Sequence, residues 1–121
     1  MGGRFQRNTQ GALFETYVVS ELVKQRFNAG QPADLYFWRD HTGHEVDVLY
    51  ETPQGLQAIE IKSGSTFAAD WLEGVHKWRQ VVGEVTLPPL VIFGGEGSYE
   101  RESCRVRGWR LLETHNLDPV D

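Results

Sequence analysis

The 121-residue chain is poor in cysteine and has no long apolar run, and each absence excludes certain kinds of protein. The single cysteine, Cys104, excludes a disulfide framework and a zinc cluster held by several thiolates. The sequence has neither the hydrophobic segment of a signal peptide nor an apolar stretch of membrane-spanning length. We therefore expect a cytoplasmic protein without a membrane partner.

Positive charge is also scarce, since 12 lysines and arginines face 17 acidic residues and the net charge is −5. Nonspecific affinity for nucleic acid comes mainly from basic side chains that neutralise phosphates. To hold DNA or RNA, this chain would need local basic groups, a metal ion or a partner chain. A phosphate-binding Gly-x-x-x-x-Gly-Lys-Ser/Thr loop is absent as well, because the glycine-rich segment at residues 94–97 is acidic and lacks the lysine, so nothing indicates nucleotide hydrolysis.

The length suits one domain, which we place at residues 11–121, after a polar and flexible N-terminal arm at residues 1–10. Apolar residues at helical spacing predict one helix from Ala12 to about Phe27 and a second from Phe67 to Val82. Strand-like segments are found at residues 34–39, 45–51, 56–62, 89–93 and 105–111. The sequence thus predicts the order helix, three strands, helix, strand, strand.

The turn between the second and third strands decides which side chains face each other. A two- or four-residue loop centred between Pro53 and Gln54 pairs Val46 with Ile61, Val48 with Ile59 and Tyr50 with Gln57. A three-residue loop would instead bury charges beside valines, which is costly. We expect the first register, with a four-residue loop, because the fixed φ of proline does not suit a primed two-residue turn.

In that register the opposite face of the hairpin carries the charged residues. Glu45 lies across from Lys62, and Asp47 lies across from Glu60, with Cβ atoms about 5 Å apart. Two facing carboxylates repel each other, and protonation, the Lys62 ammonium or a bound cation would relieve the repulsion. Carboxylate oxygens suit Mg²⁺ or Mn²⁺ better than zinc. The alternative is an ordinary solvated sheet face with a cross-strand ion pair.

Four segments in this order carry a resemblance to a known family: Gly11-Ala12-Leu13-Phe14-Glu15, Phe37-Trp38-Arg39-Asp40, Glu45-Val46-Asp47 and Ile59-Glu60-Ile61-Lys62-Ser63-Gly64. Together they resemble the uncharacterised domain at the C-terminal end of prokaryotic AAA+-type ATPases, which is similar to PD-(D/E)XK nucleases. The resemblance covers roughly residues 11–93. It implies an α/β fold of the restriction-endonuclease-like type, α-β-β-β-α-β(-β), with a central mixed sheet flanked by helices.

The resemblance also implies roles for individual residues. Asp47 and Glu60 would bind Mg²⁺ or Mn²⁺, Glu15 would be the acid of the first helix and a further metal ligand, and Lys62 would be the lysine of the motif. Val46 stands where the motif name has proline, a departure that is common in the superfamily. Lys62 would orient or deprotonate a water molecule, or neutralise developing charge.

Arg39 is a candidate for contacting a phosphate of the substrate, although it could equally pair with Asp40 or Glu45. A basic concentration near the C-terminus could also grip phosphates, but a charged, solvated edge strand is the competing interpretation; its members are Arg101, Arg105, Arg107 and Arg110. Trp71 and Trp78 lie seven residues apart on one helical face, which is typical of core packing.

Two functions follow from these observations. The first is a metal-dependent nuclease that hydrolyses phosphodiester bonds of DNA or RNA, alone or beside an AAA+-type ATPase. The second is a catalytically inactive interaction or dimerisation module descended from a nuclease, which the acidic charge and small size favour. The sequence leaves open whether the chain is complete or part of a larger ATPase.

Overall fold

The computed structural model describes residues 9–32, 34–83 and 86–113. It contains two α-helices, α2 (Thr9–Asn28) and α3 (Glu73–Val81), the latter preceded by a 3₁₀ turn, η1 (Ala69–Leu72). A second 3₁₀ turn, η2 (Trp109–Glu113), follows the last strand. The strands are β1 (Tyr36–Arg39), β2 (Glu45–Thr52), β3 (Gly55–Lys62), β4 (Leu90–Phe93), β5 (Ser98–Arg101) and β6 (Cys104–Gly108).

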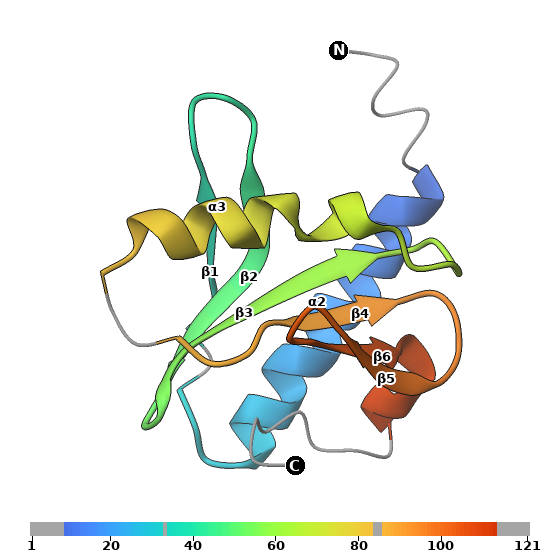
Figure 1. Cartoon of the computed structure of the whole chain (residues 1–121). Coiled ribbons are helices and arrows are strands. Elements are labelled where there is room, and N and C mark those ends of the chain that lie inside the picture. Colours follow the sequence, from blue (N-terminus) through green and yellow to red (C-terminus); the bar gives the residue numbers. More distant parts are fainter. Residues whose placement is uncertain (1–8, 33, 84–85, 114–121) are drawn as a thin grey trace.

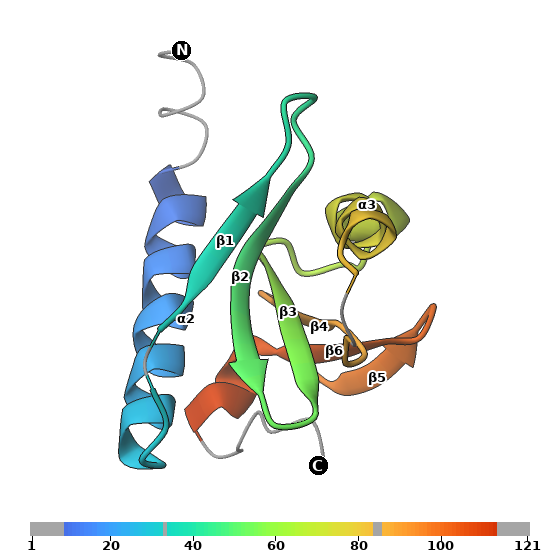
Figure 2. The ribbon, with the colours of Figure 1, turned by 90° about the vertical axis from the view of Figure 1, so that its left-hand side faces the viewer.

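The strands form one six-stranded mixed sheet in the order β1-β2-β3-β4-β6-β5. The first three strands make an antiparallel meander, and β3, β4 and β6 run parallel to one another. The helix α3 carries the chain from β3 to the parallel strand β4 (Figure 1). Figure 2 shows α2 along one face of the sheet and α3 on the other. The expected α-β-β-β-α-β order and mixed sheet flanked by helices are therefore present.

Each face of the sheet has its own hydrophobic core. On the α2 side, Val18 and Leu22 pack against side chains from β2, β3 and β4, and Trp109 from η2 contacts Phe14 and Tyr17 edge-to-face. On the other side, Val75 and Trp78 of α3 pack against residues of β2 and β3. All four residues of β4 are buried, as the sequence predicts for a strand covered on both faces. Trp78 is a core residue, and Trp71 packs beside a second buried cluster.

The element boundaries differ from the expected ones at both ends of the chain. The helix α2 begins at Thr9, three residues before the predicted start, and residues 1–8 of the predicted arm lie outside the described residues. The sequence did not predict β5, which pairs with β6 as a hairpin whose turn holds Glu102 and Ser103 at positive φ. As a result β6 lies inside the sheet and Arg105 is buried, so the interpretation of a solvated edge strand is wrong for this segment.

A β-bulge in β2 corrects the predicted faces of the hairpin. Tyr36 pairs with Leu49 and Trp38 with Val46. These two pairs are three residues apart along β2 but only two residues apart along β1. One extra residue reverses the alternation of side chains beyond it. Val46 therefore packs with Val75 and Trp78 on the α3 side, whereas Val48 belongs to the α2-side core. The expectation that both valines share one face was wrong.

The predicted register is correct from the turn up to the bulge and ends there. Val48 pairs with Ile59 and Tyr50 with Gln57, as expected, but the paired residues of β2 and β3 stop at Val48. The predicted backbone pairs of Val46 with Ile61, Asp47 with Glu60 and Glu45 with Lys62 are not among them.

The loop between β2 and β3 has two residues, Pro53 and Gln54, and not the four that we expected. The Thr52 hydroxyl accepts hydrogen bonds from the backbone N–H groups of Gln54 and Gly55, and donates to the Gly55 carbonyl at 2.8 Å. Gly55 adopts a φ of 142°, a conformation that glycine tolerates. The side chain of Thr52 and the freedom of Gly55 thus allow a short loop that begins with proline.

Gly74, in the first turn of α3, lies against the backbone of β2. A Cβ atom at this position would be 2.0 Å from the Glu45 carbonyl oxygen. Glycine in a helix costs up to about 1 kcal/mol relative to alanine, and here its small size lets α3 approach the sheet closely.

Within the described residues, no helix combines the length and the hydropathy that spanning a bilayer requires.

Candidate functional site

Asp47 lies at the bulge, where β2 and β3 stop pairing. Its Oδ2 atom accepts a hydrogen bond from the backbone N–H of Ile61 at 2.8 Å, in place of a backbone carbonyl of β2. A carboxylate that replaces a carbonyl in this way satisfies a donor of β3 and is itself fixed in position. The bulge therefore holds the Asp47 carboxylate at the opening between the two strands.

Glu60, on β3, is the buried member of the acidic pair, with only 3% of its surface exposed. Desolvation, together with the charge of Asp47 and a side-chain hydrogen bond with it, raises the pKa of Glu60 to about 9, and the nearby Lys62 ammonium only partly opposes this. Glu60 is therefore protonated at neutral pH when no cation is bound. The two carboxyl groups meet through their side chains and not as a regular cross-strand pair.

Lys62 ends β3, and the backbone around it is fixed by glycine contacts. The N–H of Gly94 donates to the carbonyl of Lys62 at 3.0 Å and to that of Gly64 at 2.9 Å. A Cβ atom on Gly94 would be 2.1 Å from the Ser63 carbonyl oxygen, so only glycine fits here. The half-buried Lys62 is close enough to lower the pKa values of Glu15 and Glu60 by its charge.

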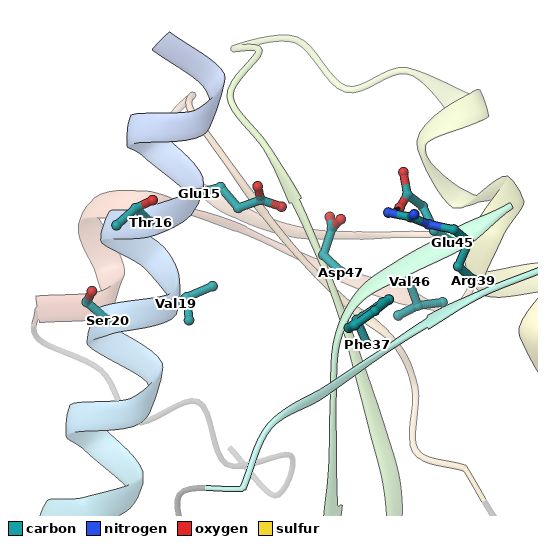
Figure 3. A pocket seen from close by; sticks show the side chains of 9 residues that line it. All are labelled: Glu15, Thr16, Val19, Ser20, Phe37, Arg39, Glu45, Val46 and Asp47. Atoms are coloured by element: carbon teal, nitrogen blue, oxygen red, sulfur yellow. Dashed lines mark hydrogen bonds and ion pairs between the residues drawn. The ribbon is translucent and has the colours of Figure 1, made fainter. Parts of the chain in front are cut away.

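Glu15 projects from α2 toward Asp47, as Figure 3 shows. The residue is exposed by its overall surface, yet partial desolvation of its carboxyl is the main cause of a raised pKa. The charges of Asp47 and Glu45 raise the pKa further, and Lys62 lowers it. The first helix thus brings a third acid close enough to Asp47 for their charges to interact.

A pocket of about 440 Å³ separates α2 from the meander (Figure 3). Its walls come from one side of α2 and from β1 and β2, and they consist of Glu15, Thr16, Val19, Ser20, Phe37, Arg39, Glu45, Val46 and Asp47. Among the predicted residues, Glu15, Asp47 and Arg39 line the pocket. Glu60 and Lys62 do not line the pocket. They interact with residues that do, because Glu60 contacts Asp47 and the charge of Lys62 acts on Glu15.

Arg39 forms an exposed ion pair with Glu45, with 3.3 Å between Nη2 and Oε1. It therefore pairs with one of the two acids named as alternatives, while Asp40 has its own partners in the adjoining turn. Desolvation alone would raise the pKa of Asp40, but hydrogen bonds from Thr42 and His44 lower it to about 2. His44 contacts both Asp40 and Thr42 and so belongs to this turn.

Comparison with known proteins adds a family to this geometry. Residues 10–113 match the family described as "Domain of unknown function (DUF4143)". The chain belongs to this family. No curated protein and no solved structure matches this chain. Membership of an uncharacterised family agrees with part of the resemblance found in the sequence, and the association with an ATPase and the likeness to nucleases remain predictions.

The acids of this DUF4143 domain fit a divalent cation of the Mg²⁺ type. Glu60 holds a proton at neutral pH and is hydrogen-bonded to Asp47, and a cation can replace that proton and remove the repulsion. Both offer hard oxygen ligands. In the part of the chain that the structure describes, no three His, Cys, Asp or Glu side chains gather as a metal-binding group. A bound ion would therefore take two carboxylates and complete its shell with water, as Mg²⁺ commonly does.

Sequence reasoning missed several pocket residues of the DUF4143 domain. Thr16, Val19 and Ser20 line the pocket from α2 and flank the predicted Glu15. Their positions one, four and five residues after Glu15 follow from helical periodicity, so the signal was available in the sequence. Phe37 was noted only as part of a resembling segment, and its exposed ring depends on the edge position of β1, which the sequence did not reveal.

Proposed function

We propose that this DUF4143 domain is a metal-dependent nuclease that hydrolyses phosphodiester bonds, as the resemblance of its sequence to PD-(D/E)XK nucleases suggests. The observation that carries the proposal is the side-chain hydrogen bond between the partly buried Asp47 and the buried Glu60 near Lys62, with a pKa of about 9 for Glu60. An isolated acidic pair destabilises a fold, and such perturbed groups cluster at functional sites. The element order α-β-β-β-α-β is the one expected for that superfamily.

Asp47 and Glu60 would hold Mg²⁺ or Mn²⁺, which supplies Lewis acidity and a lowered pKa for bound water. The hydrogen bond from Ile61 orients Asp47, and the rigid end of β3 orients Lys62. Lys62 would neutralise charge that develops on the phosphate or position the attacking water. Glu15 would act through a water molecule or take part in binding a second ion, since the three acids do not form one cluster among the described residues.

The test is cleavage of single-stranded and duplex DNA and RNA by the purified chain with Mg²⁺ or Mn²⁺. We expect cleavage that EDTA stops and that Asp47→Ala or Lys62→Ala reduces at least a hundredfold. Glu51→Ala and Lys77→Ala are matched controls, because both residues are exposed and lie outside the pocket. Cleavage that persists in Asp47→Ala would assign the activity to a contaminant or to another site and would refute the proposal.

The second candidate is an interaction module, and exposed apolar residues on β1 favour it. Tyr36 and Phe37 are 59% and 68% exposed, and β1 has a neighbour on one side only in the described sheet. Unprotected apolar edge strands tend to pair with other chains. Light scattering would detect a homodimer, and Tyr36→Lys should dissociate one built on this edge. An AAA+-type ATPase domain is the other partner that the sequence resemblance suggests.

A further inference from the structure

Phe37 presents its phenyl ring to solvent at the wall of the pocket that contains Asp47. The ring is 68% exposed and lies on the same side of β1 as the pocket (Figure 3). Most other large apolar side chains of the meander are buried in one of the two cores. An exposed aromatic ring beside polar groups in a concave site is a common recognition feature.

The other walls of the pocket supply complementary chemistry. Thr16 and Ser20, four residues apart on α2, contribute hydroxyl groups, and Val19 and Val46 add apolar surface. The Arg39 guanidinium lies 5.8 Å from the centre of the Phe37 ring. A flat ring, hydroxyl donors and a cation thus lie together within a pocket of about 440 Å³, which is in the usual size range for small-ligand sites.

We propose that this pocket binds one unpaired nucleotide, whose base stacks on Phe37 and whose phosphate is held by Arg39, so that the domain acts on single-stranded nucleic acid. This inference rests on the proposed function and names its substrate class. A base in a duplex has both faces covered by its neighbours, so it cannot stack on the ring. An unpaired base has a free face, and stacking on an aromatic side chain tolerates any base.

The charge of the chain agrees with this choice. A protein that grips a duplex usually neutralises many phosphates, and this chain has a net charge of −5. Stacking needs no positive charge, so a single aromatic contact with one arginine can serve an acidic domain. Arg39 must exchange Glu45 for the phosphate, and its exposed ion pair with Glu45 is inexpensive to open.

The experiment measures binding of fluorescent oligonucleotides by anisotropy in the full chain carrying Lys62→Ala, so that the probes stay intact in Mg²⁺. The probes are a 12-nucleotide single strand and a duplex of the same sequence. We expect tighter binding of the single strand. Adding Phe37→Ala should weaken it about 5- to 100-fold, and Phe37→Trp should retain it.

Phe27→Ala is the matched control, since Phe27 is 75% exposed near the end of α2 and does not line the pocket. It should leave binding unchanged. Equal affinity for the duplex, indifference to Phe37→Ala, or no binding of either probe would overturn the inference.

Cleavage assays on the chain with Lys62 intact separate this inference from the proposed function. If the binding pattern holds but nothing is cleaved, the proposed function fails and the nucleotide pocket stands. If duplex is cleaved as fast as single strands and Phe37→Ala has no effect, the nuclease stands and the pocket assignment fails.

Discussion

Asp47 accepts a hydrogen bond from the backbone N–H of Ile61 at 2.8 Å, and this contact links the bulge of β2 to the strand that carries Glu60 and Lys62. A side-chain carboxylate here fills the place of a missing ladder carbonyl. The Asp47 carboxylate therefore stabilises the sheet and also belongs to the candidate site. Its substitution by asparagine keeps the shape and an amide oxygen as acceptor, while it removes the charge.

The buried Glu60 predicts a stability that falls as pH rises. Its folded-state pKa of about 9 exceeds its ordinary value of 4.5, so the folded state holds the proton more tightly. The resulting stabilisation is complete below pH 4.5 and is lost as pH rises through about 9, by up to about 1.4 kcal/mol per pH unit in between. Urea denaturation in EDTA from pH 5 to 9 measures this loss.

Glu60→Gln imitates the protonated acid and should make stability nearly constant over that range. At pH 5 the variant and the parent should unfold at similar urea concentrations, and at pH 9 the variant should be the more stable. Parallel curves for both proteins would show that Glu60 does not titrate in this window.

Metal binding should be coupled to the same proton. Because a cation must displace the proton from Glu60, the affinity for Mn²⁺ should rise with pH, by up to about tenfold per unit below pH 9. Calorimetry in two buffers of different ionisation enthalpy counts the released proton. Asp47→Asn should weaken binding at least tenfold at every pH, and Glu51→Ala should not change it. Binding without proton release would place the cation elsewhere.

Gly74→Ala should destabilise the fold although alanine is the better helix former. The added Cβ would lie 2.0 Å from the Glu45 carbonyl oxygen, so α3 must move away from β2. Overpacking of this kind costs about 1 to 3 kcal/mol, which exceeds the gain of up to about 1 kcal/mol in helix propensity. Thermal denaturation measures the loss. Gly83→Ala is the control, because a Cβ at Gly83 meets no atom within 4 Å.

The turn after β1 should be sensitive to strong acid. Asp40 has a pKa of about 2, below its ordinary 3.8, so its contribution to stability is present above pH 3.8 and disappears as pH falls through about 2. The amide signals of Thr42 and His44 should shift with a midpoint near pH 2 in NMR titrations, because both amides donate to Asp40. Asp40→Asn should abolish this transition, and Thr42→Val should move it to higher pH.

Sequence periodicity predicted the element order because each of these elements, except β5, carries a strong local pattern. The burial of β4 and of Trp78 follows directly from an apolar run and from helical spacing. The register at Val48 and Ile59 was also predictable, since a one-residue slip would bury charges. These features depend on neighbours along the chain or on a single turn.

The errors arose where distant contacts overrode local patterns. The bulge that separates the faces of Val46 and Val48 depends on the pairing of β1 with β2, and the alternation within β2 gives no sign of it. The buried position of Arg105 depends on β5, a short strand of mostly polar residues that pairs with β6. For the site, we expected Asp47 and Glu60 to lie close together as a regular cross-strand pair. They are instead joined by a hydrogen bond between their side chains.

The hydrogen bond between Asp47 and Glu60 also allows the state of the β2–β3 hairpin to be followed by infrared spectroscopy. A protonated carboxyl group absorbs infrared light apart from ionised carboxylates, so at neutral pH protonated Glu60 should give such a band, which Glu60→Gln would remove. Slippage of β2 at the bulge that admits water to Glu60 and separates it from Asp47 would ionise Glu60. Loss of the band would then record local rearrangement of two strands before the remainder of the sheet unfolds.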